Sequence, residues 1–276
     1  KKDLEMILDE VITRPEIMKI TKDSEGNEFA ELSGSFAANA GITVRGTYQE
    51  DDSFHMDYYY PYVFGTSITT NEQIDVEKHA EKESYAGVCD EVNLGVTLIF
   101  YIQNVADYLA ETNRHLSKIH YGAMLAGLST EGKILCPVVE RKKNDVPAIQ
   151  KNDRHNQLIA QAREGDEDAI ESLTLEDMDT YALLSQRVMK EDIFSIVKST
   201  FMPFGIESDQ YTVLGEIIDC VTMENKLTHE KLYGMKLLCN NIQFDVCINE
   251  KDLLGEPAIG RRFRGNVWMQ GNLCLE

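Results

Sequence analysis

Residues 255–273 read GEPAIGRRFRGNVWMQGNL and gather four glycines, three arginines and the only tryptophan of the chain. The first eight residues resemble a phosphate-binding loop, whose pattern is GxxxxGK[ST]. Arg261 stands where that loop needs a lysine to reach the phosphates, and Arg262 stands where it needs a hydroxyl to bind magnesium. A nucleotide-binding loop is therefore not supported at this position.

After Gly260 the same stretch alternates with a period of two residues, which is typical of a β-strand. Phe263 and the apolar residues that follow it share one face with two glycines. Arg262, Arg264 and Trp268 share the opposite face. We interpret the stretch as a loop that enters a strand, in which the glycines allow the strand to curve.

Bulk properties narrow the class of protein. The chain has 276 residues, of which 43% are hydrophobic, and a formal net charge of -20. This excess of acidic groups repels phosphates, so nucleic acid is disfavoured as a partner. No apolar run approaches the roughly 20 residues of a membrane helix. The six cysteines form no CxxC pair, so we expect buried, reduced thiols and a cytoplasmic location.

Short segments rich in Val, Ile, Thr, Tyr and Phe predict strands in both halves of the chain. DLEMILDEVI predicts an amphipathic helix near the start, and EDDS predicts a hairpin turn. YGAMLAGL and KILCPVV read as two strands joined by a turn at STEGK, which makes Ser129 a turn residue.

These patterns predict an α+β protein. Residues 1–140 are expected to form a mainly antiparallel sheet domain with covering helices. The basic stretch 141–155, RKKNDVPAIQKNDRH, is the expected linker. Residues 156–205 have helical spacing and form the expected helical connector. Residues 206–276 are expected to form a small β-barrel, similar to oligonucleotide-binding barrels.

Several longer stretches carry a family resemblance. They are VEKHAEKESYAGVCDE, AREGDEDAIESLTLEDMDTY, KEDIFSIVKSTFMPFG and YGMKLLCNNIQFDVCINEKDLLGEPAIGRRFRGNVWMQG. Together they resemble an uncharacterised domain-of-unknown-function family of Gram-positive anaerobic bacteria, and the C-terminal half resembles a helical-plus-small-barrel module. The resemblance implies a bacterial, cytosolic protein but supplies no catalytic residue, cofactor or substrate.

One group of polar residues could carry chemistry. His55 and Asp57 are two residues apart, and so are His79 and Glu81, so each pair would share one face of a strand. Side by side, the two pairs would provide ligands for a transition metal or an acid–base pair. A solvated sheet face with cross-strand charge pairs explains the same pattern, and no standard metal motif is present. The sequence therefore predicts no metal and no cofactor.

Aromatic and arginine residues give a second group. Tyr58 and Tyr60 lie on one face of the strand HMDYYYPYVFG, and Arg262, Arg264 and Trp268 share a face of the last strand. Such residues are frequent anchors of binding interfaces. They can equally pack in the core, with Trp268 covered by the protein's own helices.

We interpret the protein as a non-enzymatic binding or adapter module with an unknown protein or peptide partner, although the sequence does not decide whether it is an enzyme. A metal-dependent hydrolase that uses His55, Asp57, His79 and Glu81 is the first alternative. A single-stranded nucleic-acid binder that uses the C-terminal barrel is the second.

Overall fold

The computed structural model describes residues 2–78, 82–114, 120–138, 161, 166, 168–169, 171–173, 197–206 and 208–275. The chain divides into two compact units, one formed by Lys1–Leu135 with Ser199–Glu276 and the other by Cys136–Lys198. The described fold belongs almost entirely to the first unit. The linker predicted over 141–155 and most of the helical connector predicted over 156–205 lie outside the described residues.

The first unit begins with a helix and a four-stranded sheet. Their bounds are α1 Lys2–Thr13, β1 Ile17–Lys22, β2 Glu28–Ala37, β3 Ala40–Tyr48 and β4 Phe54–Val63. The strands pair in chain order, and every pair is antiparallel. The predicted turn at EDDS is confirmed, because β3 and β4 are joined there and Gln49 N donates to Ser53 O.

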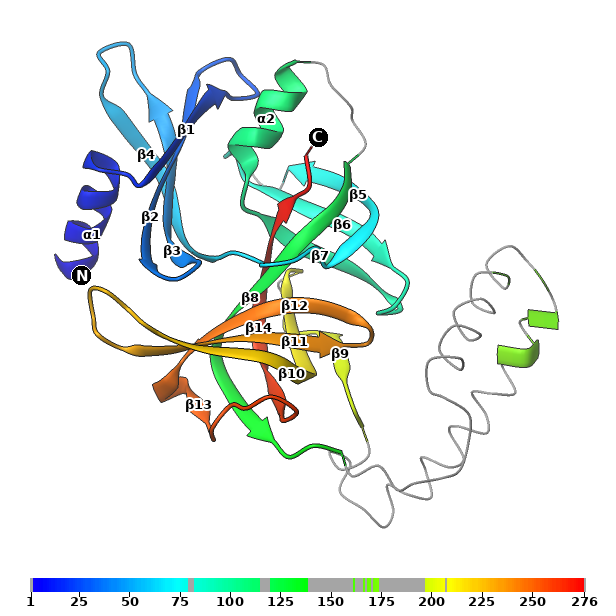
Figure 1. Cartoon of the computed structure of the whole chain (residues 1–276). Coiled ribbons are helices and arrows are strands. Elements are labelled where there is room, and N and C mark those ends of the chain that lie inside the picture. Colours follow the sequence, from blue (N-terminus) through cyan, green and yellow to red (C-terminus); the bar gives the residue numbers. More distant parts are fainter. Residues whose placement is uncertain are drawn as a thin grey trace. The chain divides into compact units, whose positions relative to one another are not determined.

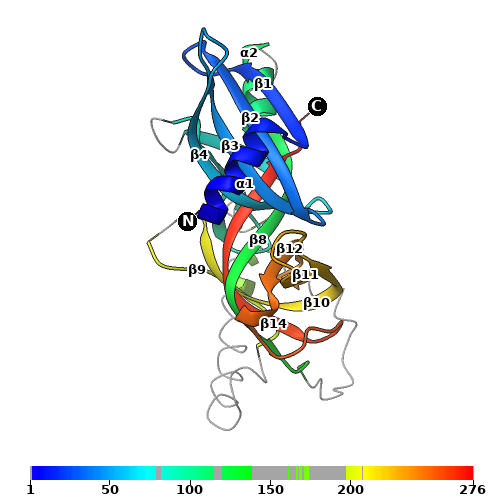
Figure 2. The same ribbon diagram turned by 90° about the vertical axis from the view of Figure 1, so that its left-hand side faces the viewer.

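Helix α1 covers one face of this sheet, as Figure 2 shows. Its apolar residues recur at helical spacing, so Leu8 and Val11 point to the same side. They pack against Ala30, Leu32 and Val44 of β2 and β3. The amphipathic helix predicted from the sequence is confirmed, and it gives this sheet a small hydrophobic core of its own.

The second sheet contains ten strands (Figure 1). From the first half of the chain, the sheet contains β5 Thr70–Lys78, β6 Tyr85–Glu91, β7 Val96–Ile102 and β8 His120–Leu135. Helix α2 Val105–Asn113 lies between β7 and β8 in the sequence. From the second half of the chain, the sheet contains β9 Thr200–Pro203, β10 Gln210–Glu224, β11 Lys231–Cys239, β12 Ile242–Asn249, β13 Leu253–Leu254 and β14 Arg262–Leu273. The 3-10 turn η1 Glu250–Asp252 joins β12 to β13. The sheet is mixed, since β12 and β13 run parallel to β8, and β14 runs parallel to β7.

Two long strands, β8 and β14, lie side by side at the centre of this sheet. They pair antiparallel from Arg262 opposite Leu135 to Leu273 opposite Ala123. The other edge of β8 pairs with β5, β12 and β13 in turn. The other edge of β14 pairs with β10 and then β7. The alternation predicted for β14 is confirmed from Phe263 to Met269, where Phe263, Val267 and Met269 are buried and the residues of the opposite face are only partly buried.

The predicted fold class is wrong, since the described residues are mainly strands and form one large mixed sheet rather than an α+β domain followed by a separate barrel. Strands β10, β11, β12, β8 and β14 pair in a closed cycle. That cycle includes β8, which belongs to the first half of the chain. The strands of residues 206–276 therefore need β8 to complete their backbone hydrogen bonds. Periodicity along the sequence reveals strands but not which distant strand pairs with them.

The turn predicted at STEGK is also wrong, because β8 is one continuous strand of 16 residues. Opposite this stretch the register shifts between Asn266 and Val267, which is the signature of a β-bulge. The Ser129 hydroxyl donates to the carbonyls of Glu131 and Asn266, at 2.9 and 2.8 Å. The polar residues that suggested a turn therefore accommodate a bulge inside a strand.

Phe100 shows how closely the central strands approach one another. Its ring is fully buried and lies over two glycines, Gly87 on β6 and Gly271 on β14. A Cβ atom at Gly87 would lie 2.3 Å from Cζ of Phe100, and one at Gly271 would lie 2.8 Å from Cδ2 of the same ring. The absence of side chains at these positions leaves room for the aromatic ring.

We predict that Gly87→Ala lowers the free energy of unfolding by about 1–3 kcal/mol, because the added methyl group overpacks the core around Phe100. Urea titration measures the loss. Gly215→Ala is the matched control. A Cβ atom at Gly215 would lie 3.1 Å from its nearest neighbour, the carbonyl oxygen of Leu238, so this variant should lose less free energy of unfolding. Equal losses for the two variants would contradict this account of Gly87.

Two buried cysteines lead to a second prediction. Burial raises the pKa of the Cys89 and Cys239 thiols to about 12. At pH 8 both are therefore protonated, and the thiolate is the form that reacts. We expect iodoacetamide to label Cys220, which is only half-buried, well before either of them, as followed by mass spectrometry. Labelling of Cys89 or Cys239 at the rate of Cys220 would contradict the structure.

Candidate functional site

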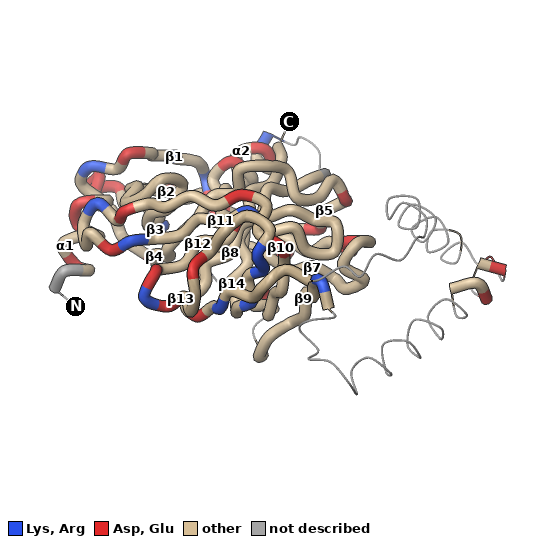
Figure 3. The backbone as a smooth tube through the Cα atoms, turned by 60° about the horizontal axis from the view of Figure 1, so that its bottom comes forward, with Lys and Arg blue, Asp and Glu red and all other residues tan. Residues whose placement is uncertain are grey.

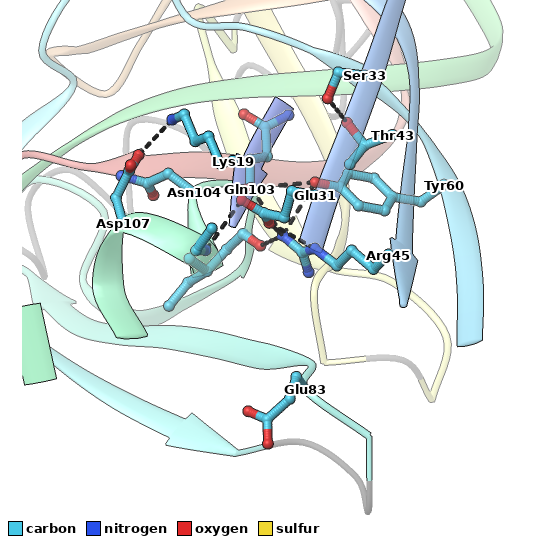
Figure 4. A network of polar contacts seen from close by, with 12 residues as sticks. Lys19, Glu31, Ser33, Thr43, Arg45, Tyr60, Glu83, Gln103, Asn104 and Asp107 are labelled. Carbon is cyan, nitrogen blue, oxygen red and sulfur yellow. Dashed lines mark hydrogen bonds and ion pairs between the residues drawn. The ribbon is translucent and has the colours of Figure 1, made fainter. Parts of the chain in front are cut away.

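The most distinctive side chain of the unit is Arg45 on β3, which is 0% exposed. An arginine keeps its charge when buried, so it needs oxygen partners for its five N–H groups. Glu31, the residue opposite on β2, provides the first. Arg45 Nε donates to Glu31 Oε1 at 2.7 Å, and Nη2 lies 2.6 Å from the same oxygen (Figure 4).

The remaining N–H groups of Arg45 reach oxygens of both sheets. Nη1 donates to the Tyr58 and Tyr101 hydroxyls at 2.9 and 2.7 Å. Nη2 donates to the Tyr60 hydroxyl at 3.1 Å, and to the carbonyls of Ile102 and Gln103 at 3.1 and 2.8 Å. Tyr58 and Tyr60 belong to β4, whereas Tyr101 and Ile102 belong to β7. Arg45 therefore connects the two sheets.

Glu31 also determines how helix α2 begins. Its Oε2 accepts a hydrogen bond from Ala106 N, in the first turn of α2, at 3.0 Å. A carboxylate at this end of a helix satisfies a free N–H and interacts favourably with the helix dipole. The N-cap residue Asn104 makes no side-chain cap bond, because its amide pairs with both backbone groups of Leu273. Glu31 thus takes the role of the N-cap side chain at the start of α2.

The protonation states of this network are stable. Burial by itself would lower the pKa of Arg45, but the neighbouring oxygens of Tyr60 and Glu31 hold it well above its ordinary value. Burial raises the pKa of Tyr60 and Tyr101 above that of a free phenol, although the Arg45 cation acts in the opposite direction. The guanidinium stays charged and both phenols stay neutral near pH 7, so the network is suited to holding a geometry rather than to transferring protons.

A cavity of about 310 Å³ lies beside this network, and we call it the polar cavity. Its walls come from β1, β2 and β3 on one side and from α2, β8 and β14 on the other. Ser33 and Thr43 line it with hydroxyls that are 2.8 Å apart. Lys19 and Asp107, which are both partly exposed, line it and form an ion pair at 2.6 Å. Its polar groups are drawn in Figure 4.

Gln103 contributes the unusual group of the polar cavity. This residue is 4% exposed, and its Nε2 donates to Val63 O at 2.9 Å and to Gln270 Oε1 at 2.7 Å. Both partners are acceptors, so the orientation of the amide is fixed by them. Its Oε1 is buried and has no hydrogen-bond partner among the described residues. Leaving a buried acceptor unpaired costs about 1–3 kcal/mol. The atom has essentially no exposed surface, so the surrounding groups cover it.

The aromatic residues singled out in the sequence lie in the same region, but mostly inside the protein. Tyr60 is buried, and the Tyr58 hydroxyl donates to Glu83 O at 2.7 Å. The Trp268 ring lies 5.3 Å from that of Tyr101, and its Nε1 donates to Asp209 Oδ2 at 2.7 Å. The structure therefore brings Tyr58, Tyr60 and Trp268 together around one aromatic cluster.

The two arginines of β14 differ from each other. Arg262 is buried, whereas Arg264 is half-buried and lines a second cavity of about 410 Å³. Leu254 and Phe204, which are both exposed, line the same cavity. Arg264 thus faces a hollow on the outer side of β14, away from the alternating residues that enter the core.

The predicted His/carboxylate patch is described only in part. His55 is exposed on β4, and Asp57 is half-buried, with its backbone carbonyl accepting a bond from Lys82 Nζ at 2.7 Å. His79 and Glu81 lie outside the described residues. Within the described ranges, no group of three or more His, Cys, Asp or Glu side chains is placed to hold a metal ion.

Sequence reasoning missed Glu31, Arg45 and Gln103. A weak signal existed, because Glu31 and Arg45 are opposite charges that interrupt the apolar strands EFAELS and GITVRGTYQ. Only the cross-strand register shows that they face each other. Gln103 follows the apolar run VTLIFYI directly, and nothing in the sequence distinguishes it from an ordinary strand end.

The described residues thus define a mixed β-sheet protein with a polar cavity where its two sheets meet. The chain belongs to the family described as "Domain of unknown function, E. rectale Gene description (DUF3881)", whose sequence profile matches residues 1–271. This confirms the predicted membership of a domain-of-unknown-function family. Searches of curated proteins and of solved structures found no match. No helix in the described ranges combines the length and apolar character needed to cross a membrane.

We predict that Arg45→Met lowers the free energy of unfolding by about 3–5 kcal/mol, because it leaves the Glu31 carboxylate buried without its cation. Lys251→Met is the control, since it breaks the exposed Lys251–Glu230 pair and should leave the urea midpoint almost unchanged. A similar midpoint for the two variants would show that Arg45 does not hold the sheets together.

Proposed function

We propose that this protein is a non-enzymatic binding protein that holds a small polar molecule in the polar cavity. The observation that carries the proposal is the cavity itself, whose wall combines apolar side chains with the Lys19–Asp107 ion pair. Ligand sites commonly combine apolar walls with a few well-placed polar groups, and their volumes begin at about 300 Å³. The polar cavity fits the lower end of that range.

Binding is favoured over catalysis because the reactive groups around the cavity already have partners. Both oxygens of Glu31 are hydrogen-bonded, one to Arg45 and one to Ala106 N. Ser33 pairs with Thr43, so it has no base at hand to activate its hydroxyl. The residues that surround the cavity can orient a molecule, but those in the described ranges do not form a nucleophile–base pair.

An adapter role with a protein or peptide partner is the second candidate. Of the five residues proposed to face a partner, Tyr60 and Arg262 are buried. Arg264 is the best remaining anchor, because it lines the 410 Å³ cavity with Phe204 and Leu254, whose side chains are exposed. Arginine next to exposed apolar side chains is typical of protein interfaces.

The surface charge and the thiols support two further elements of the proposal. Acidic and basic positions are interspersed along the described chain (Figure 3), and the net charge of -20 disfavours nucleic acid. The nucleic-acid alternative also depended on a separate C-terminal barrel. Cys89, Cys220, Cys239, Cys247 and Cys274 have free thiols, which suits a reducing, cytoplasmic environment.

We predict that at least one of four probes with the same carbon skeleton binds in the polar cavity. The probes are 4-methylpentanamide, which is neutral, L-leucinamide, which is cationic, 4-methylpentanoate, which is anionic, and L-leucine, which is zwitterionic. Binding is measured by the NMR shifts of the Gln103 side-chain amide in the full chain. A molecule bound in the cavity should shift this amide, because Gln103 lines the cavity.

Asn272→Trp is the blocking variant, because Asn272 is half-buried and lines the polar cavity. It should abolish the binding of every probe. Thr222→Trp, at an exposed position of β10, is the matched control and should bind as the wild type does. If none of the four probes shifts the Gln103 amide, or if both tryptophan variants bind equally well, the proposed function is wrong.

A further inference from the structure

The charged groups of the polar cavity fall into two sets. The first is Glu31, which is neutralised by Arg45 behind it. The second is Lys19 on β1 with Asp107 on α2, 2.6 Å apart, with side chains that are 42% and 41% exposed. Their exposure means that water screens their attraction, so this ion pair holds the two elements together only weakly. One positive and one negative group are thus available where the cavity reaches solvent.

We propose that the ligand of the polar cavity is a free α-amino acid with an apolar side chain. This inference rests on the proposed function and specifies its ligand. An α-amino acid carries an ammonium and a carboxylate on one carbon, so it can pair with Asp107 and Lys19 together. A ligand with a single charge would pair with only one of them, so it would form one ion pair where an α-amino acid forms two.

The two charged groups of the cavity assign the two ends of the ligand. An ammonium group has three N–H donors. One of them can bind the Asp107 carboxylate, which lines the cavity. Lys19, Asp107 and Gln103 all line the same cavity, and Figure 4 shows Gln103 between the Lys19–Asp107 pair and the Ser33–Thr43 pair. The carboxylate then binds Lys19, which provides donors only.

Part of the cavity wall is apolar and suits an aliphatic side chain. Ile17, Phe64, Met124 and Leu273 contribute hydrocarbon surface. Burying such a side chain is worth about 25 cal/mol per Å² of apolar surface removed from water. A second charge at that end of the ligand would lie against this surface with no partner among these four residues. The wall therefore favours apolar amino acids over acidic or basic ones.

The experiment compares the same four probes by isothermal titration and by the shift of the Gln103 amide. We expect L-leucine to bind at least about tenfold more tightly than L-leucinamide, 4-methylpentanoate or 4-methylpentanamide, which corresponds to about 1.4 kcal/mol. L-Aspartate and L-lysine should bind more weakly than L-leucine, because their second charge meets the apolar wall.

Two variants test the assignment of each charge. Lys19→Met should weaken L-leucine about tenfold and should not weaken L-leucinamide, which has no carboxylate. Asp107→Asn should weaken L-leucine and should not weaken 4-methylpentanoate, which has no ammonium. Lys251→Met and Glu230→Gln, which break an exposed ion pair elsewhere in the unit, are the matched controls and should bind L-leucine as the wild type does.

The outcomes separate this inference from the proposed function. If 4-methylpentanamide or one of the singly charged probes binds as tightly as L-leucine, the amino-acid assignment is wrong and the cavity is still a binding site. Equal weakening of all probes by Lys19→Met would likewise overturn the assignment. If no probe binds, both the inference and the proposed function are wrong.

Discussion

The antiparallel pairing of β8 with β14 is the constraint on which the rest of the unit depends. Each strand in a sheet has two edges, and its N–H and C=O groups must be satisfied on both. Here one edge of each strand is used by the other, along the whole of β14. The two outer edges then receive β5, β12 and β13 on β8, and β10 and β7 on β14. Two stretches more than 120 residues apart along the chain thus determine where the other strands attach.

A second constraint acts between the sheets. Arg45 carries a charge that burial does not remove, so its five donors require oxygens in fixed positions. The oxygens come from β2, β4, β7 and the residue after β7, and Glu31 extends the same set of contacts to α2. The walls of the polar cavity are therefore attached to one another by hydrogen bonds. A cavity held in this way needs little reordering of its walls, which would lower the entropic cost of the binding proposed for it.

The sequence predicted local features well and long-range pairing poorly. The helix over DLEMILDEVI, the hairpin at EDDS and the alternation of β14 depend on neighbouring residues, and all three are confirmed. The STEGK turn and the separate barrel were wrong because a bulge and a shared strand edge involve partners far away in the chain. The stretches enriched in tyrosine and tryptophan do come together in one aromatic cluster beside Arg45. Their enrichment did not reveal that these rings are partners of a buried arginine, since Arg45 reads as an ordinary charged residue of a strand.

The position of β14 in the chain has a consequence for synthesis on the ribosome. Strand β8 is complete at residue 135, but its main partner spans residues 262–273. During translation β8 therefore has an unsatisfied edge while more than a hundred further residues are added, and the large sheet closes only after its last strand has emerged. The four-stranded sheet with α1 contains only neighbouring strands and can form early. The protein is thus synthesised in an order that completes one wall of its cavity first and joins the opposite wall to it last.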